Sequence, residues 1–324
     1  MIMTYKHAYL IIAHDNLEIL QRLLTLVDDR RNDIYVHIDK KCKDVPFSKL
    51  KNCVKSAKVH FIQQIAVEWG GDTLIKAELL LLKEATKEQH LYYHLLSGVD
   101  LLLWTQDEVH DYFMRNNGKE FISFDSDIDK NEIEKRIGYY HILQNYIGRK
   151  HGKKVAVYYQ IEKCLIYLQK LAGIKRTRKS KIEYCKGSNW FSISQELAEY
   201  ILMNEKWIKK YFFKSFCIDE LFLQTLVRNS KYKNRVTNKN LRLIDWERGT
   251  PYTFTQEDYD MIISSGMMVA RKFNEKKDMK IVNQIVSYVE RKKYSEVLEE
   301  HIMQKCLLKL LYSLYIGSYN HGLK

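Results

Sequence analysis

The chain of 324 residues contains only two prolines, Pro46 and Pro251, and none of its six cysteines belongs to a CxxC pair. So little proline argues against proline-rich linkers and long disordered arms. Scattered cysteines argue against a disulfide framework and against zinc-type spacing, so we expect reduced thiols in an intracellular protein. Length and composition together predict one large or two modest folded domains.

Long apolar runs are also missing, because no window of eighteen apolar residues occurs anywhere in the chain. The apolar run of residues 8–13 is too short to cross a bilayer, and no small-residue cleavage site follows it. We therefore expect a cytoplasmic protein. Peripheral contact with the inner membrane face is a further option.

Two nucleotide-binding fingerprints are absent as well. Neither GxGxxG nor GxxxxGK[ST] follows any strand-like segment, which argues against a dinucleotide dehydrogenase and against a P-loop enzyme. A sugar-nucleotide site needs no such glycine pattern. That class of enzyme therefore remains open.

Positive charge is in surplus, with 53 Lys and Arg against 40 Asp and Glu and a net charge of +13. Such a surplus suits an anionic ligand or surface: a nucleotide, a nucleic acid or acidic lipid. Residues 131–172 read as helical, and an apolar and aromatic stretch at 155–172 precedes a basic run at 175–181. This pattern suits an anionic membrane, although a solvated loop or substrate steering remain alternatives. No recognised nucleic-acid-binding motif accompanies the cations, so a nucleic-acid-binding α/β protein is kept only as an alternative.

The first 125 residues alternate strand and helix patterns. Such alternation predicts a doubly wound α/β sheet, in which ligands bind beyond the carboxyl ends of the strands. The pattern predicts strands at 8–13, 34–39, 59–62 and 92–96, and helices at 17–28 and 73–87.

Polar residues follow the expected strand ends at His14, Asp39, Asp100 and Asp125. Asp125 also begins an Asp-x-Asp pattern with Asp127, and two acids at this spacing can hold Mg²⁺ or Mn²⁺ against a diphosphate. A solvated loop is the alternative interpretation, because the charged run continues beyond Asp127.

Asp219 and Glu220 are adjacent carboxylates inside an apolar stretch. Phe222, Leu223 and Leu226 follow at helical spacing, so we expect the two acids to open a helix that packs its apolar face. A carboxylate held at the mouth of a core is placed to act as a general base, because burial raises its pKa toward working pH. From these residues alone, a simple complement to the helix dipole is the favoured interpretation, and the general base is the alternative.

Seven blocks together resemble the core-2/I-branching β-1,6-N-acetylglucosaminyltransferase family, which also includes the peptide O-xylosyltransferases. They occur in the family's order across roughly residues 5–275. The resemblance implies a bacterial member with a GT-A-like, Rossmann-type mixed α/β sheet flanked by helices. It places the transferase domain at 1–275 and a helical C-terminal extension, packed on it, at 276–324. The blocks are 8–14, 36–41, 67–71, 92–100, 186–192, 219–220 and 270–273.

The same resemblance implies an inverting transfer of a sugar, expected to be GlcNAc, from a UDP-sugar to a hydroxyl of a saccharide acceptor. We expect the acceptor to be lipid-linked, in the synthesis of a surface polysaccharide. Glu220 matches the family's general base, and Asp219 is expected to cap the helix. Basic residues are expected on the diphosphate in place of a metal, so no cofactor is expected. A metal-dependent GT-A enzyme that uses Asp125 and Asp127 with Mn²⁺ or Mg²⁺ is the alternative.

On the donor side, Lys272 matches the family's diphosphate contact. Eukaryotic members carry a second arginine where this chain has Tyr252. Because a leaving diphosphate without a metal needs at least two cations, we expect Arg248 or Arg271 to replace it, with Arg242 as a further candidate. The positions that match the nucleoside contacts are Ala13, His14 and Asp39.

On the acceptor side, the resemblance places an acid at Asp125, an arginine at Arg136 and a tryptophan beside the sugar at Trp246. Asp100, which closes one of the matching blocks, is expected on this side as well. Trp190 either stacks on a sugar ring or fills the core. If Asp125 serves the acceptor, its role as a metal ligand falls away.

Overall fold

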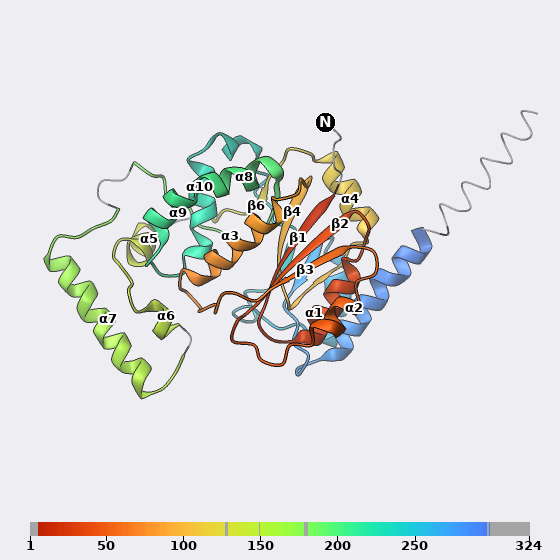
Figure 1. Ribbon diagram of the computed structural model, residues 1–324, viewed down its shortest axis with the longest axis horizontal. Helices are drawn as coiled ribbons and strands as arrows, with labels where there is room; N and C mark the ends of the chain where they lie inside the picture. Colours follow the sequence, from red (N-terminus) through yellow and green to blue (C-terminus); the bar gives the residue numbers. More distant parts are fainter. Residues whose placement is uncertain (1–5, 127–128, 149, 178–180, 297, 299–324) are drawn as a thin grey trace, which may run out of the picture.

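The computed structural model describes residues 6–126, 129–148, 150–177, 181–296 and residue 298. A six-stranded mixed sheet lies at its centre, in the order β3-β2-β1-β4-β7-β6 (Figure 1). The first four strands in this order are parallel, and β7 runs antiparallel to both β4 and β6. Its strands are β1 (His7–Ala13), β2 (Asn32–Ile38), β3 (Lys58–Ile62), β4 (Tyr92–Ser97), β6 (Phe121–Ile122) and β7 (Phe191–Ser194).

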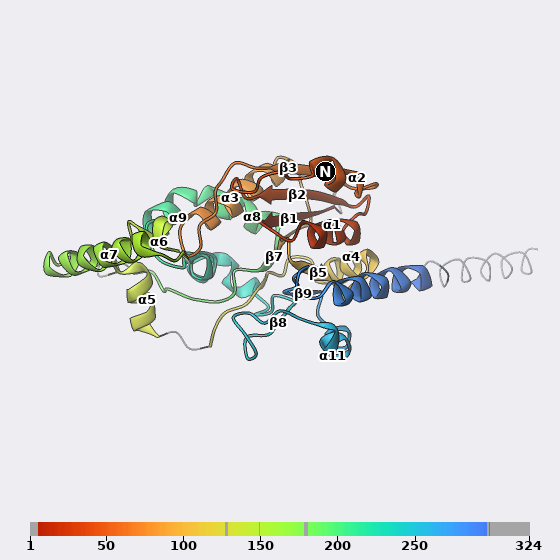
Figure 2. The same ribbon diagram turned by 90° about the horizontal axis from the view of Figure 1, so that it is seen from below.

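Helices cover both faces of this sheet, as Figure 2 shows from below. Short 3₁₀ turns interrupt the later half of the chain. The helices are α1 (Leu17–Leu26), α2 (Phe47–Asn52), α3 (Thr73–Ala85), α4 (Gln106–Arg115), α5 (Lys130–Ile137), α6 (Gln144–Ile147), α7 (Lys153–Leu171), α8 (Gln195–Met203), α9 (Glu205–Phe212), α10 (Phe222–Arg228) and α11 (Tyr259–Ser264), and the 3₁₀ turns are η1 (Ile218–Glu220), η2 (Lys231–Arg235) and η3 (Gln256–Asp258).

Strand β1 shows why the sheet lies between two helical layers. Tyr9 and Ile11 point into one core, shared with α1, while Ala8, Leu10 and Ile12 point into the other, shared with α3, α8 and α10. Successive side chains of a strand point to opposite faces, so a continuously apolar strand requires cover on both sides. The predicted α/β sheet flanked by helices is confirmed.

A second sheet of three strands lies beside the main one, in the order β5 (Asp100–Leu102), β9 (Val269–Arg271) and β8 (Arg242–Ile244) (Figure 2). Residues 279–296 are helical, and Ile281 and Ile285 are fully buried in the core that also contains β5 and β9. This part of the expected C-terminal extension therefore packs on the body, while residues 299–324 lie outside the described residues. The boundary at residue 275 stays a prediction, because both sides share one core.

Two local predictions needed correction. The first predicted helix ends at Leu26 rather than at residue 28. The sequence also favours Asn16 as its cap, but the side-chain oxygen of Asn16 accepts from the backbone N–H of Glu275 at 3.0 Å and makes no cap hydrogen bond. The region 131–172, predicted to be helical, is divided among α5, α6 and α7. The first interruption begins at Gly138 and the second includes Gly148 and Gly152, since glycine has a low helix propensity.

Candidate active site

The carboxylate of Glu220 lies at the end of η1, directly before α10. Arg136 of α5 donates to its Oε2 at 2.7 Å, and Arg136 also donates to the carbonyl of Cys217 at 3.1 Å. The backbone carbonyl of Glu220 accepts from the N–H of Gly187 at 3.0 Å. The Glu220 side chain is 34% exposed. It is therefore held in one orientation and still open to a ligand.

Glu220 is the end of a chain of alternating charges. Arg136 also contacts Glu132 (2.6 Å), and Glu132 in turn contacts Lys186 (3.3 Å). Lys186 reaches the carboxylate of Asp125 at 3.4 Å. Five side chains from four separate segments thus meet at one place. Each charge lies beside the opposite sign, which fixes the geometry more strongly than an isolated exposed pair does.

The loop 186–190 connects the two sides of this region. A Cβ on Gly187 would lie 2.0 Å from the carbonyl oxygen of Ser123, so no larger residue fits there without moving the backbone. At the far end of this loop, the guanidinium of Arg271 lies over the ring of Trp190, 4.2 Å from the ring centroid. The same loop therefore touches Glu220 through Gly187 and Arg271 through Trp190.

Two further acids lie behind Glu220. Burial and the charge of Glu220 raise the pKa of Asp219 from its ordinary 3.8 to about 6. Glu78 of α3 is fully buried, and burial followed by the charge of Asp219 raises its pKa well above the usual range. Neither oxygen of Glu78 has a hydrogen bond to a described residue, although Asn189 lies near enough to lower the pKa in part.

The expected cap at Asp219 is wrong. The N-cap position of α10 is Leu221, and no side-chain cap hydrogen bond is made there. Instead of opening a regular α-helix, Asp219 and Glu220 belong to the 3₁₀ turn η1. The sequence pattern of a helix start is therefore not followed here, because this turn packs against α3 with its buried Glu78.

The three residues matched to the nucleoside lie at the carboxyl ends of β1 and β2. The backbone N–H of Asp39 donates to the carbonyl of Ala13 at 2.8 Å, and both of these residues are buried. The Asp39 carboxylate accepts from the N–H groups of Lys41 (2.8 Å) and Val67 (3.2 Å). His14 is exposed beside Asp15. The predicted strand-end edge is therefore formed, with Asp39 organising its loops, and the nucleoside contacts stay predictions.

The cations considered for the diphosphate differ in their surroundings. Arg242 is buried and donates to Ser192 and to the carbonyls of Leu95 and Phe191, so it fastens strand ends and does not fit a ligand contact. Arg271 donates to Asp100 at 2.8 Å and is held over Trp190. Lys272 is half-buried directly after β9, and its carbonyl accepts from the N–H of Phe254 at 3.0 Å.

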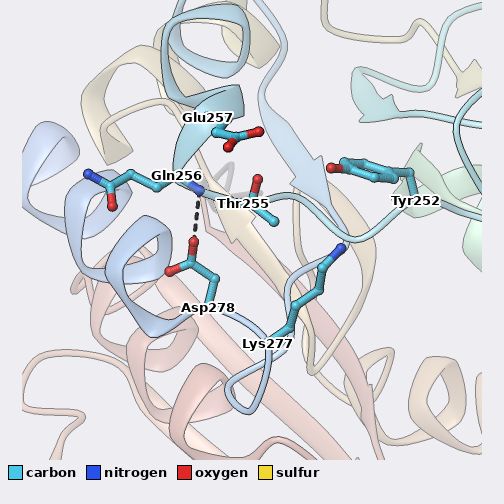
Figure 3. A pocket seen from close by; sticks show the side chains of 6 residues that line it. All are labelled: Tyr252, Thr255, Gln256, Glu257, Lys277 and Asp278. Carbon is cyan, nitrogen blue, oxygen red and sulfur yellow. Dashed lines mark hydrogen bonds between the residues drawn. The ribbon is translucent and has the colours of Figure 1, made fainter.

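Tyr252, the residue matched in the sequence to the second arginine of eukaryotic members, has two cations close to its ring. The guanidinium of Arg248 is 4.1 Å from the ring centroid, and the ammonium of Lys277 is 4.7 Å from it. Arg248 is also paired with Asp245 (2.5 Å) and Asp258 (2.7 Å). A hollow of about 630 Å³ opens beside the ring, as Figure 3 shows; it is lined by Tyr252, Thr255, Gln256, Glu257, Lys277 and Asp278.

The residues predicted for the acceptor are only partly brought together. Asp125 and Arg136 join the charged chain that ends at Glu220, while Trp246 is exposed. Asp100 is fully buried and accepts from Ser97 and Arg271, a geometry that does not fit an acceptor contact. Trp190 is almost fully buried beneath Arg271, so filling the core is the better interpretation of its role.

The Asp-x-Asp metal hypothesis stays a prediction, because the structure describes only one of its two acids. The carboxylate of Asp125 faces Lys186, and Asp127 lies outside the described residues. Within the ranges that the structure describes, no group of three or more His, Cys, Asp or Glu side chains is arranged to hold a metal ion.

Sequence reasoning missed Glu78 and Glu132. Glu78 carries a signal, because it lies in one stripe with Ile75, Leu79 and Leu82, where an apolar residue is expected. Glu132 looks like any acid in the first turn of an exposed helix. Its link to Lys186 becomes visible only in three dimensions.

Comparison with known proteins bears on the family of the chain, not on single residues of the site. The model of the Core-2/I-branching enzyme family matches residues 7–265. A xylosyltransferase of Ciona intestinalis is 21% identical over 303 residues, which cover 86% of this chain and 33% of the relative. Beta-glucuronosyltransferase GlcAT14C of Arabidopsis thaliana is 24% identical over 325 residues, covering 91% and 78%.

Xylosyltransferase 2 of Rattus norvegicus is 21% identical over 254 residues, covering 74% of this chain and 26% of the relative. The chain thus spans a third or less of the length of both xylosyltransferases. Among solved structures, mouse xyloside xylosyltransferase 1 in its apo form aligns with a TM-score of 0.36 and 11% identity, over 81% of this chain and 96% of that one. From the family match over most of its length, the chain belongs to the Core-2/I-branching enzyme family.

Proposed function

We propose that this chain is an inverting glycosyltransferase that moves a sugar from a UDP-sugar to a hydroxyl of a saccharide acceptor, with Glu220 as the general base. The observation that carries the proposal is the carboxylate of Glu220, which is partly exposed and oriented by Arg136 at 2.7 Å. A base must be held within hydrogen-bond reach of the proton that it removes. Membership of the family supports the reaction class.

In the proposed reaction, the acceptor oxygen attacks the anomeric carbon from the face opposite to UDP. Glu220 takes the hydroxyl proton as the new bond between carbon and oxygen forms. The bond from the anomeric carbon to the diphosphate breaks, and UDP leaves with the electron pair. Attack and departure on opposite faces invert the configuration at that carbon.

The charge that develops on the diphosphate requires cations. We propose Lys272 for this role, assisted by Arg248 or by Arg271. Lys277 is a further candidate, because it lies with Arg248 on the ring of Tyr252. These cations would take the place of a metal ion. The ion pair of Asp125 with Lys186 supports this, because it leaves the Asp125 carboxylate beside a positive charge.

GlcNAc is the donor sugar that we propose, for an acceptor in surface polysaccharide synthesis. The names of the relatives point to xylose and glucuronic acid as competing donors. One pocket contact is worth only a few kcal/mol, so small changes decide among these sugars. Nothing in the described residues favours the nucleic-acid alternative.

A thermal-shift panel tests the proposal. The full chain is melted with UDP, UDP-GlcNAc, UDP-xylose and UDP-glucuronic acid, each with EDTA and with Mn²⁺. We expect stabilisation by UDP and one sugar in EDTA, because a ligand that binds only the folded state raises the melting temperature. Stabilisation that requires Mn²⁺ would restore the metal-dependent alternative.

The Glu220→Gln variant tests the base. We expect UDP to stabilise it as it does the wild type, while transfer falls by about 10²- to 10⁴-fold. The matched control is Glu247→Gln, which changes an exposed glutamate near Trp246. Near wild-type turnover in Glu220→Gln would remove the assignment of the base.

A further inference from the structure

Helix α7 is long, rich in apolar residues and almost entirely exposed. Val157 is 57% exposed, Ile161 44%, Leu168 53% and Leu171 67%, whereas Glu162 is the one buried residue of this helix. Figure 1 shows α7 at one end of the molecule, opposite the C-terminal helix. Exposed apolar area of this extent marks an interaction surface.

Five of the exposed residues form one stripe. Val157, Ile161, Cys164, Leu168 and Leu171 follow each other at intervals of four and three residues, which places them on a single face of a helix. At 100° per residue, this face lies opposite Glu162, so it points away from the body of the protein. We call these five residues the α7 stripe.

The opposite face of α7 is already fastened. The carboxylate of Glu162 accepts from the backbone N–H of Leu143 at 3.1 Å and lies 3.3 Å from His141. Gln169 exchanges two hydrogen bonds with the backbone of Tyr140, at 2.8 and 3.0 Å. These contacts fix the orientation of the helix, so that the α7 stripe faces away from the body of the protein.

The charges around the stripe have one sign. The exposed charged residues of α7 are Lys153, Lys154, Lys163 and Lys170, since its single acid, Glu162, is turned inward. Two copies of this helix would bring lysines against lysines, which disfavours self-association. The surface complements an anionic partner.

Aromatic side chains widen the surface. Tyr146 and Tyr167 are exposed, and so are Ile142 and Ile174 on the segments that flank α7. Tyrosine is enriched where one end of a side chain meets an apolar phase and the other meets water. The exposed apolar surface is therefore wider than the contact that a single partner helix would make.

We propose that α7 lies on an anionic bilayer surface, with the α7 stripe at the boundary of headgroups and acyl chains and the lysines at the phosphates. No helix in the described part of the chain is long and apolar enough to cross a membrane, so the contact is peripheral. The proposal does not depend on the reaction that the protein catalyses. It also connects the membrane contact to the site, because the segment that holds α7 directly follows α5, which carries Arg136.

Vesicle co-sedimentation with the full chain tests the proposal. We expect binding to vesicles of phosphatidylcholine with 30% phosphatidylglycerol, weak binding to phosphatidylcholine alone, and loss of binding at high salt. Leu168→Asp with Ile161→Asp should weaken binding at least tenfold, and Lys163→Glu with Lys170→Glu should do so as well. The matched control is Met203→Asp, an exposed apolar residue on α8, which should bind like the wild type.

Circular dichroism and thermal melts show that each variant is folded before it is compared. Equal binding of the stripe variant and the wild type would overturn the proposal, and so would absence of binding to anionic vesicles. Light scattering provides a second measurement. A concentration-dependent dimer that Leu168→Asp abolishes would assign the stripe to a second copy of the chain instead.

Discussion

The Asp219→Asn variant should make the protein more stable at neutral pH. The pKa of Asp219 rises from 3.8 to about 6 because of burial and the neighbouring charge of Glu220. A raised carboxyl pKa means that the folded state holds the proton more tightly than the unfolded state. The corresponding stability is fully present below pH 3.8 and is lost as the pH rises through 6.

The magnitude follows from this shift. At pH 7.5 the ionised Asp219 costs the folded state about 3 kcal/mol as an upper bound, and at pH 4.5 the cost is about 1 kcal/mol. Removal of the charge should therefore stabilise the protein by up to about 3 kcal/mol at pH 7.5 and by clearly less at pH 4.5. For a chain of this size, each kcal/mol corresponds to about 2 °C in melting temperature.

Thermal melts of wild type and Asp219→Asn between pH 4.5 and 8 measure this difference. Asp44→Asn is the control, because Asp44 is an exposed acid with a left-handed backbone that asparagine also adopts. An equal gain at both ends of the pH range would show that the effect is not electrostatic. No gain at pH 7.5 would refute the reasoning.

Three further outcomes are expected. Glu78→Gln should also stabilise the protein at pH 7.5, because burial and the charge of Asp219 raise the pKa of Glu78 and so disfavour its ionised form in the folded state; a lower melting temperature would contradict this. Arg136→Met should lower kcat by about 100-fold through loss of orientation of Glu220, whereas Arg136→Lys should retain part of the activity; equal loss of UDP stabilisation in both would indicate a general structural defect instead. Gly187→Ala should cost about 1–3 kcal/mol because its Cβ meets the Ser123 carbonyl, and an unchanged denaturant midpoint would be inconsistent with this.

Much of the sheet was predictable from the sequence. Continuously apolar runs such as residues 8–13 require cover on both faces, and β1 has it. The alternation of strands with helices around residues 17–28 and 73–87 likewise predicts the layers, and the structure shifts these boundaries by about two residues. The hydrophobic pattern predicts these elements because neighbouring residues along the chain determine which faces of a strand or helix are apolar.

The arrangement of charges was less predictable, because it depends on contacts between distant segments. The sequence suggested Arg136 as an acceptor residue but gave no sign of its contact with Glu220, 84 residues away. Asp100 and Asp39 look alike as acids at strand ends. Only the fold shows that Asp100 faces Arg271 and is closed to ligands.

The loop 186–190 has a consequence for how this enzyme could change its preferences. Because Gly187 holds Glu220 and Trp190 holds Arg271, a shift of this loop alters the two sides together. If Glu220 serves the acceptor and Arg271 the donor, as proposed, a change in this loop should alter both preferences at once. A chimaera that exchanges one half of the site should therefore include residues 186–190, so that the contacts to Glu220 and to Arg271 stay compatible.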